Sequence, residues 1–277
     1  MIYKGQSIRC EMLENGIAEV NFDSQSGSVN KFDKATLGEL NSVVAALNAE
    51  SNVRGAIVTS SKGVFIVGAD INEFLAMFND TREQMIEWCA QANAIFSAFE
   101  DLPFPTAVAI NGFALGGGME MALSCDFRIA TPAARVGLPE TQLGIIPGFG
   151  GTTRLPRLIG VDNAIEWIAT AKPQRPEAAL KVGAIDAVVE ADQLKAVALQ
   201  MINDAADGKL DWKNRRQVKQ SPIRLNKIEQ TMAFNVAKGV VGAKAMPHYP
   251  APMEAIAVIE KSANLGRDEA LKIEHEG

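Results

Sequence analysis

The amino-acid sequence predicts an α/β fold followed by a helical extension, and two observations lead to this prediction. In the first 190 residues, short β-rich runs alternate with segments whose apolar residues recur at helical spacing. Strands that are separated by helices are typical of parallel sheets covered by helices. After about residue 191 the strand-like runs stop, and helical periodicity continues to the end of the chain.

The expected strands are short and the expected helices longer. Residues 17–22 alternate apolar and polar side chains, which is typical of a half-buried strand. Residues 36–47 and 81–99 carry apolar stripes at helical spacing, and the second stripe, which includes Met85 and Trp88, is expected to face the core. Further strands are expected at residues 56–59, 106–110, 126–130 and 184–189, and a short helix at 119–124.

The last third of the chain is predicted to be mainly helical. Helices are expected at residues 191–206, 227–244 and 252–276, whereas the charged residues 207–222 are expected to be irregular. Within this charged segment Lys213, Arg215 and Arg216 are interpreted as a solvated charge run. The proline-rich residues 246–252 would break any helix that passed through them.

These patterns divide the chain into three parts. We expect an α/β core over residues 1–190, a helical extension of the same domain over 191–250, and a terminal linker-like helix over 251–277. The apolar positions of the terminal helix need a surface to cover. This surface belongs to the core, to another copy, or to a following domain outside this chain. In each case the helix is expected to lie outside the active site.

Composition narrows the class of protein. Hydrophobic residues make up 47% and charged residues 22% of the 277 residues, which is typical of a globular protein. A net charge of -6 disfavours a general affinity for nucleic acid or for an anionic membrane. No apolar run reaches the roughly 18 residues of a membrane span. The N-terminus lacks a signal-peptide pattern, and the three cysteines are expected to be reduced and buried, so a cytoplasmic protein is predicted.

Histidine is too scarce for several common kinds of active site. The sequence contains His248 and His275, both late in the chain, and it has no Gly-x-Ser-x-Gly elbow for a serine nucleophile. It also has no Cys/His cluster that would bind zinc, so no metal site is predicted. Acid/base chemistry is therefore expected to depend on carboxylates.

Glycine gathers in residues 65–71, 111–120 and 137–151. In the second stretch Gly116, Gly117 and Gly118 precede an expected helical turn. Glycines at a helix start expose N–H groups without intrahelical partners, and such groups suit an anion or a developing oxyanion. Close packing is the more common use of three such glycines taken alone. Residues 148–153 look like a dinucleotide loop but lack its third glycine and a preceding strand, so NAD binding is not expected.

Two glutamates strengthen the catalytic interpretation. Glu120 lies in an otherwise apolar segment, where an ionised carboxylate is costly and its pKa should rise. Glu140 follows Pro139, whose fixed backbone would orient it. The plainer alternatives are a solvent-facing side chain for Glu120 and a helix-start residue for Glu140. Two carboxylates beside two glycine-rich N–H sites nevertheless form a coherent acid/base site.

At these motifs the sequence resembles the crotonase (enoyl-CoA hydratase/isomerase) superfamily. The resemblance covers residues 17–189 and rests on Phe-Ile-Val-Gly-Ala-Asp at 65–70, Asn-Gly-Phe-Ala-Leu-Gly-Gly-Gly-Met-Glu at 111–120, Gly-Leu-Pro-Glu at 137–140 and Ile-Pro-Gly-Phe-Gly-Gly-Thr at 146–152. It implies a crotonase-like spiral of ββα turns followed by helices. It also implies an acyl-CoA substrate and no separate cofactor, because coenzyme A is part of the substrate.

The resemblance implies roles for individual residues. The two oxyanion-hole N–H groups of the family fall on Ala69 and Gly117, and its two catalytic carboxylates fall on Glu120 and Glu140. Glu120 is assigned chiefly to activating water and Glu140 chiefly to protonating C2. Backbone contacts to the adenine of the substrate are implied for three neighbouring residues, Ile66, Val67 and Gly68.

The whole chain is similar to the N-terminal part of the multifunctional α-subunits of bacterial fatty-acid oxidation complexes. This closer similarity is carried by residues 28–31, by Phe149 with residues 154–157, and by residues 249–254. It implies hydration of trans-2-enoyl-CoA, Δ3-Δ2-enoyl-CoA isomerase activity, and a thiolase β-subunit as partner, whereas dehydrogenase activity is not expected of these residues. The alternatives are an isomerase with little hydration and a non-catalytic module that binds acyl-CoA or thiolase.

Overall fold

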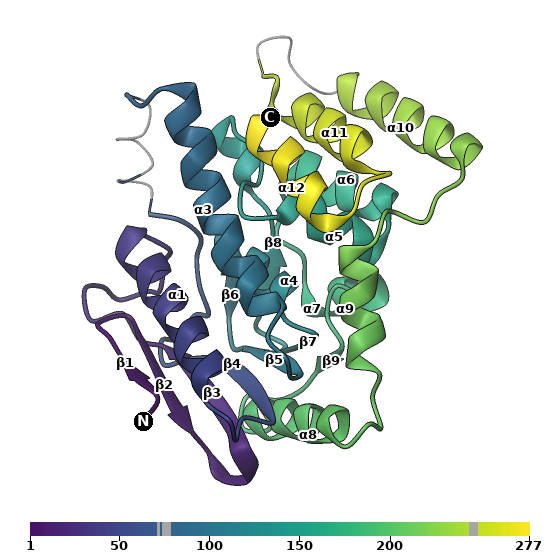
Figure 1. The fold of residues 1–277 in the computed structure, drawn as a ribbon. Helices are drawn as coiled ribbons and strands as arrows, with labels where there is room; N and C mark the ends of the chain where they lie inside the picture. The colour runs from purple at the N-terminus through teal and green to yellow at the C-terminus, as the bar shows by residue number, and fades with distance from the viewer. Residues whose placement is uncertain (71–72, 74–78, 244–248) are drawn as a thin grey trace.

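A central sheet organises the molecule. The computed structural model describes residues 1–70, 73, 79–243 and 249–277, and among them seven strands form one sheet in the order β1-β2-β3-β4-β5-β7-β9 (Figure 1). The strands are β1 (Tyr3–Lys4), β2 (Ile8–Met12), β3 (Ile17–Phe22), β4 (Gly55–Ser60), β5 (Thr106–Ile110), β7 (Phe127–Ala130) and β9 (Ala187–Val188). The pairs from β3 to β9 are parallel and those of β1–β2–β3 antiparallel. The predicted α/β layering with parallel pairing is therefore confirmed.

A second, smaller sheet lies where the glycine-rich segments meet. Its strands β6 (Phe113–Leu115) and β8 (Arg135–Gly137) are parallel, and Ile66 is bridged to Ala114 at its edge. The sequence pattern did not indicate these three-residue strands. They bring residues 65–70, 111–117 and 137–140 side by side.

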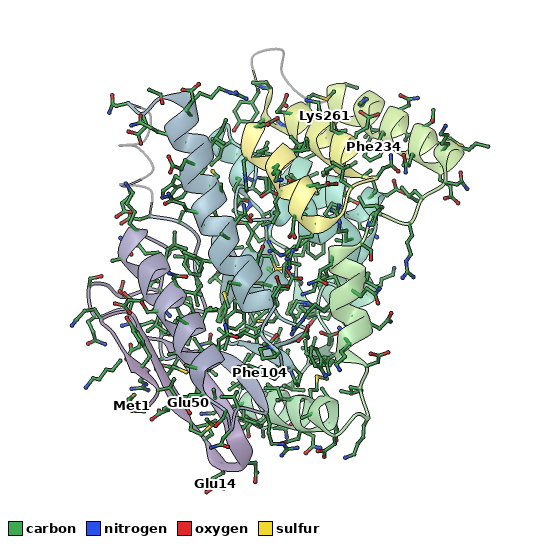
Figure 2. The ribbon with its side chains drawn as sticks, in the orientation of Figure 1. Met1, Glu14, Glu50, Phe104, Phe234 and Lys261 are labelled. Atoms are coloured by element: carbon green, nitrogen blue, oxygen red, sulfur yellow. The ribbon has the colours of Figure 1, made fainter. Side chains whose placement is uncertain are left out.

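Helices cover both faces of the central sheet. The described helices are η1 (Glu14–Gly16), α1 (Lys34–Ala49), α3 (Arg82–Glu100), α4 (Gly117–Ser124), η2 (Glu140–Leu143), α5 (Gly151–Ile159), α6 (Val161–Thr170), α7 (Pro176–Lys181), α8 (Leu194–Ala206), α9 (Trp212–Gln220), α10 (Lys227–Gly242), α11 (Ala251–Ser262) and α12 (Arg267–Glu276). Helix α8 packs its apolar face on β4, β5 and β7, while α1, α3 and α4 contribute to the core on the opposite face. In Figure 2 Phe104 lies in the interior and Met1, Glu14 and Glu50 lie at the periphery. None of the described helices has the length and apolar character of a membrane span.

The covering on both faces corrects two expectations about burial. All six residues of β3 are buried, so the half-buried strand expected at residues 17–22 is wrong. Its polar side chains have partners: Glu19 accepts a hydrogen bond from Lys195 of α8, and Asn21 donates one to Thr59. In α3 the buried face begins at Ala92, whereas Met85 is 36% exposed. The face of α3 that is buried in the core is therefore shorter than the apolar stripe that was expected to face it.

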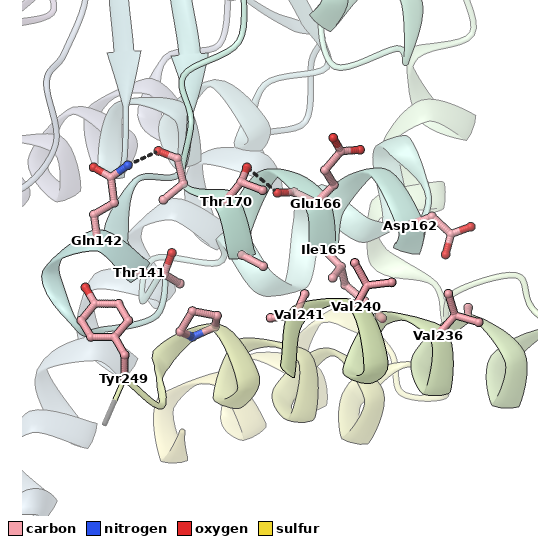
Figure 3. Close-up of a pocket in the computed structure, with 15 residues that line it drawn as sticks. Thr141, Gln142, Asp162, Ile165, Glu166, Thr170, Val236, Val240, Val241 and Tyr249 are labelled. Carbon is pink, nitrogen blue, oxygen red and sulfur yellow. Dashed lines mark hydrogen bonds between the residues drawn. The ribbon is translucent and has the colours of Figure 1, made fainter. Parts of the chain in front are cut away.

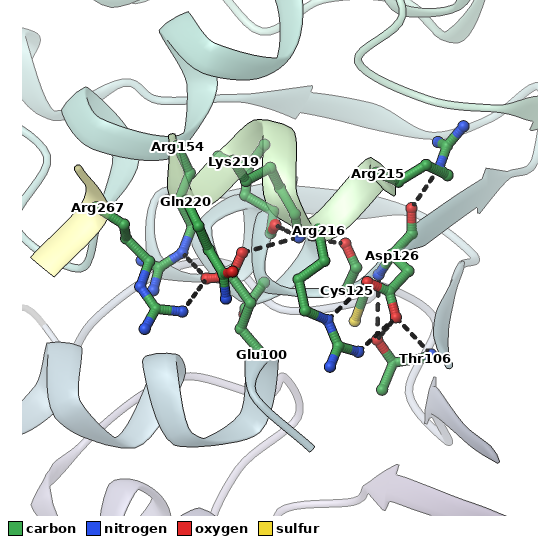
Figure 4. A network of polar contacts seen from close by, with 12 residues as sticks. Glu100, Thr106, Cys125, Asp126, Arg154, Arg215, Arg216, Lys219, Gln220 and Arg267 are labelled. Carbon is green, nitrogen blue, oxygen red and sulfur yellow. Dashed lines mark hydrogen bonds and ion pairs between the residues drawn. The ribbon is translucent and has the colours of Figure 1, made fainter. Parts of the chain in front are cut away.

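The charged segment after α8 also differs from expectation. Residues 207–222, expected to be irregular, contain helix α9, which begins after Asp211 caps its N-terminus. Arg216, interpreted as solvated, is buried and pairs with Asp126 at 2.7 Å. Lys219 is buried beside Glu100 at 3.1 Å (Figure 4). Lys213 is exposed as predicted, Arg215 is partly exposed, and only Arg216 of the predicted charge run is buried, on a distant carboxylate that no local pattern could indicate.

The C-terminal segment folds back on the chain. Residues 252–276, expected to be one helix, form two helices, α11 and α12, with a break at 263–266. Helix α11 packs on α5, α6 and α10, and α12 packs on α3 and α5 (Figure 1). Arg267, the first residue of α12, pairs with Asp101 at 2.7 Å. Of the surfaces considered for this segment, it covers the core of its own chain.

Cysteine burial follows the prediction only in part. Cys10 and Cys125 are buried and unpaired, as expected, whereas Cys89 is partly exposed. His248, one of the two histidines in the sequence, lies outside the described residues.

Candidate active site

The three glycines at the start of α4 serve different purposes. Gly116 has φ +53° and ψ -125°, a conformation that side-chain-bearing residues rarely adopt. At Gly118 an added Cβ would lie 2.2 Å from the carbonyl oxygen of Ile66, so this glycine permits close packing. At Gly117 the nearest atoms to an added Cβ belong to the rings of Phe32 and Phe149, at 3.1 and 3.2 Å. The packing interpretation therefore accounts for Gly118 but not for Gly116.

Glu120 lies one turn into α4 and points into the protein. It is 2% exposed, so the solvent-facing alternative is wrong. Its Oε1 accepts hydrogen bonds from the N–H groups of Phe149 and Gly151, both at 2.8 Å. Burial raises the pKa of Glu120 well above its ordinary value, and the charges of Glu140 and Glu274 raise it further, while the two N–H donors oppose the shift.

Glu140 approaches the start of α4 from the other side. It begins the 3-10 helix η2 directly after Pro139, so the helix-start alternative describes its place in the chain. Its Oε1 would lie only 2.7 Å from a Cβ added to Gly116, which places the carboxylate beside the start of α4. The residue is partly exposed, but its Oε2 is buried and meets no hydrogen-bond partner among the described residues. Burial raises the pKa of Glu140 to about 8, with its own backbone opposing and Glu274 adding to the shift.

The backbone around Ala69 is fixed by its neighbours. Phe32 donates its N–H to Gly68 O and accepts at its carbonyl from the N–H of Asp70, both at 2.9 Å. Among the hydrogen bonds between described residues, none uses the N–H of Ala69. The N–H of Gly117, the first residue of α4, has no intrahelical acceptor. Both N–H groups therefore have no acceptor among the described residues, and their role as oxyanion donors stays a prediction.

The residues expected near the adenine differ in accessibility. Ile66 is fully buried, donates its N–H to Phe113 O and accepts from the N–H of Leu115, so its N–H is already used. Val67 is 38% exposed, but its N–H donates to Asn30 O, and Gly68 is buried with φ +108°. Val67 is therefore the most accessible of the three residues, and all three contacts stay predictions.

A buried carboxylate that the sequence interpretation missed lies close to this site. Glu274 of α12 is 2% exposed and accepts a hydrogen bond from the N–H of Gly150, between the two residues that bind Glu120. The terminal segment is expected to lie outside the active site, and the structure places its Glu274 on the turn that also holds Glu120. A single glutamate far along the chain gave no signal that could have placed it there.

An apolar cavity of about 750 Å³ opens next to Glu140 (Figure 3). Its wall begins at Thr141 and Gln142 of η2 and continues over one side of α6 and the facing side of α10, with Tyr249 and Pro252 at one end. Glu120 and Glu140 do not line it. Its residues include Ile165, Ala169, Val236, Ala237, Val240 and Val241.

The chain belongs to the enoyl-CoA hydratase/isomerase family, whose sequence model matches residues 12–236. Among curated proteins, it is 57% identical over all 277 residues to the fatty acid oxidation complex subunit alpha of Pseudomonas aeruginosa strain PAO1. The same identity is found with this subunit in strain LESB58. The chain covers 39% of the length of each of these relatives.

Solved structures agree with this family and confirm the crotonase-like fold. An enoyl-CoA hydratase from Bacillus anthracis has a TM-score of 0.65 and is 29% identical, covering 93% of this chain and 89% of that one. DspI from Pseudomonas aeruginosa has a TM-score of 0.66 and is 29% identical, covering 78% of this chain and 85% of that one. The resemblance seen in the glycine-rich motifs is thus confirmed.

Proposed function

We propose that the chain hydrates trans-2-enoyl-CoA thioesters and that Glu120 and Glu140 are its acid/base pair. The observation that carries this proposal is the meeting of the buried carboxylate of Glu120 and the partly exposed carboxylate of Glu140, both with raised pKa, at the start of α4. The pKa of about 8 means that Glu140 holds a proton near neutral pH. One glutamate can then act as a base while the other acts as an acid.

The surroundings of the two glutamates favour a division of roles. Glu120 accepts two backbone N–H groups, which stabilise its charged form relative to a site without donors. Glu140 has a buried oxygen without a partner among the described residues and a pKa of about 8, which favours its protonated form at pH 7. Burial raises the pKa of both glutamates, so the donor pattern carries the assignment: Glu120 takes the proton of the attacking water, and Glu140 gives a proton to C2.

In the reaction, water oxygen bonds to C3 of the enoyl group while the C2=C3 π electrons move toward the thioester carbonyl. The negative charge that develops on the carbonyl oxygen needs donors, and the N–H groups of Ala69 and Gly117 are proposed to supply them. Loss of one such donor costs about 3–4 kcal/mol in other enzymes. The addition changes the net oxidation state of neither protein nor substrate, so the proposed reaction needs no redox cofactor.

Turnover of trans-2-butenoyl-CoA tests this function most simply. We expect loss of the enoyl absorbance and formation of a 3-hydroxyacyl-CoA whose hydroxyl oxygen comes from labelled water. A series of longer acyl chains would show whether the apolar cavity beside Glu140 affects chain-length preference. Saturable acyl-CoA binding without any turnover would contradict the proposal and favour the non-catalytic binding module.

Two further proposals follow from the relatives. We propose Δ3-Δ2-enoyl-CoA isomerisation at the same site, because the glutamates that serve hydration could also move a proton between C4 and C2. A 3-enoyl-CoA should then gain conjugated absorbance in the presence of the protein. Because two curated relatives are named as α-subunits of a fatty acid oxidation complex, we also propose a role in fatty-acid β-oxidation with a thiolase β-subunit as partner.

A further inference from the structure

The carboxylate of Glu274 accepts hydrogen bonds from the turn of residues 148–153 and from Asn93 of α3. Its Oε1 accepts from the N–H of Gly150 at 2.6 Å and from Asn93 Nδ2 at 3.4 Å. Its Oε2 accepts from Thr152 Oγ1 at 2.5 Å and from the N–H of Thr153 at 3.1 Å. In every one of these bonds the carboxylate is the acceptor, which is the arrangement of an ionised group. Burial raises the pKa of Glu274, whereas these donors and the charge of Arg154 oppose that shift.

The same turn holds Glu120 from its other side. The N–H groups of Phe149 and Gly151 donate to Glu120, whereas the N–H between them, that of Gly150, donates to Glu274. Successive N–H groups of the turn therefore alternate between the two carboxylates. Gly150 adopts φ +101°, and an added Cβ there would lie 1.7 Å from Arg154 Nη1, so this position of the turn requires glycine.

Apart from Glu120, Glu274 is the carboxylate that binds this turn among the described residues. Asn93 donates to the carbonyl of Gly148 at 2.7 Å, and Arg154 donates to the carbonyl of Phe149 at 3.2 Å. These donors hold carbonyl groups, whereas the N–H groups directed away from Glu120 are held by Glu274. An uncharged acceptor would be cheaper to bury, so the use of a carboxylate needs an explanation.

We propose that Glu274 is a positioning residue for the hydration reaction: it holds the turn of residues 148–153 so that the N–H groups of Phe149 and Gly151 stay directed at Glu120. This inference rests on the proposed function of the Glu120 and Glu140 pair. It makes helix α12 part of the catalytic apparatus, although Glu274 touches neither substrate nor reacting atoms.

The charge of Glu274 gives the proposal a distinctive readout. It raises the pKa of both Glu120 and Glu140, in addition to the larger effect of burial on each. Removing the charge should therefore lower both pKa values and move the pH profile of kcat toward lower pH. A residue that only stabilises the fold would not move this profile.

The test compares Glu274→Gln with Glu269→Gln, an exposed glutamate on the same helix, in the whole chain. Glutamine keeps the length and one acceptor oxygen but loses the charge and directs an amide toward donors. With trans-2-butenoyl-CoA we expect kcat of Glu274→Gln to fall about 10-fold or more, KM to change less than about twofold, and the pH profile to shift. Glu269→Gln should behave as the wild type does.

A milder variant keeps the proposal testable if Glu274→Gln does not fold. Thr152→Val removes one donor to Glu274 and leaves both carboxylates in place. We expect its kcat to fall about threefold or more with little change in KM. A folded Glu274→Gln with wild-type kcat and pH profile overturns the proposal, as does wild-type kcat in Thr152→Val when Glu274→Gln does not fold. If the wild type itself fails to hydrate the substrate, the proposed function fails and this inference fails with it.

Discussion

At the scale of single residues, the environment rather than the residue type sets the chemistry of the two glutamates. The apolar neighbours of Glu120 predict a raised pKa, and the structure confirms this direction. Glu140 gave no comparable signal, because the groups that bury it come from segments that are distant in the sequence. Glu274 gave none either, because its partners lie more than 100 residues away.

A stability measurement tests the buried state of Glu140. Its pKa is about 8 in the folded protein and about 4.3 in an unfolded chain. Between these values the unfolded chain releases a proton that the folded protein keeps, so stability falls as pH rises. Glu140→Gln removes this loss and should be more stable than the wild type by about 1–3 kcal/mol at pH 8, with little difference at pH 4.

Urea unfolding at pH 4, 6 and 8 would measure this effect. The exposed Glu177→Gln is the matched control and should show no comparable gain at pH 8. A difference between Glu140→Gln and the wild type that stays constant across this range would show that Glu140 does not titrate as described.

At the scale of elements, ion pairs in the interior tie the late helices to the core. Glu100 of α3 lies among Lys219 of α9, Arg154 of α5 and Arg267 of α12 (Figure 4). The sequence indicated that α9 carries charged side chains but not that some of them point inward. The carboxylates with which these side chains pair lie on α3 and directly before β7. The break between α11 and α12 escaped prediction because helical periodicity continues across it, although Gly266 lies in the break.

Glu100 is expected to be the most sensitive residue of this network. Burial opposes its ionisation, but the charges of Lys219, Arg154 and Arg267 outweigh burial and lower the pKa of Glu100 to about 2. Its contribution to stability is therefore present above about pH 4.5 and is lost as pH falls toward 2. Glu100→Gln leaves three buried cations short of an anion and should lower the free energy of unfolding by about 3–5 kcal/mol at pH 7.

An exposed pair gives the comparison. Arg54 and Asp207 form a surface ion pair, each with 48% of its side chain exposed. Asp207→Asn should cost less than about 1 kcal/mol in the same urea titration. Equal losses for the two variants would contradict the interpretation of Glu100 as the anion on which this buried network depends.

At the scale of the whole molecule, local patterns predict the layers but not how they meet. The alternation of strands and helices in residues 1–190 predicts the α/β core, and the glycine-rich motifs carry the resemblance that the family match confirms. The two-stranded sheet of β6 and β8 and the return of α12 to the turn of residues 148–153 depend on long-range contacts, which periodicity does not contain. The chain spans about two fifths of its curated relatives, so their whole activities remain proposals here.

The most direct test of the central claim is the turnover of Glu120→Gln and Glu140→Gln with trans-2-butenoyl-CoA. Each substitution removes a proton-transfer group and keeps the size of the side chain. We expect kcat to fall at least about 100-fold in each variant while the Kd for acyl-CoA stays close to that of the wild type. Near-normal turnover by either folded variant would show that its glutamate does not belong to the acid/base pair.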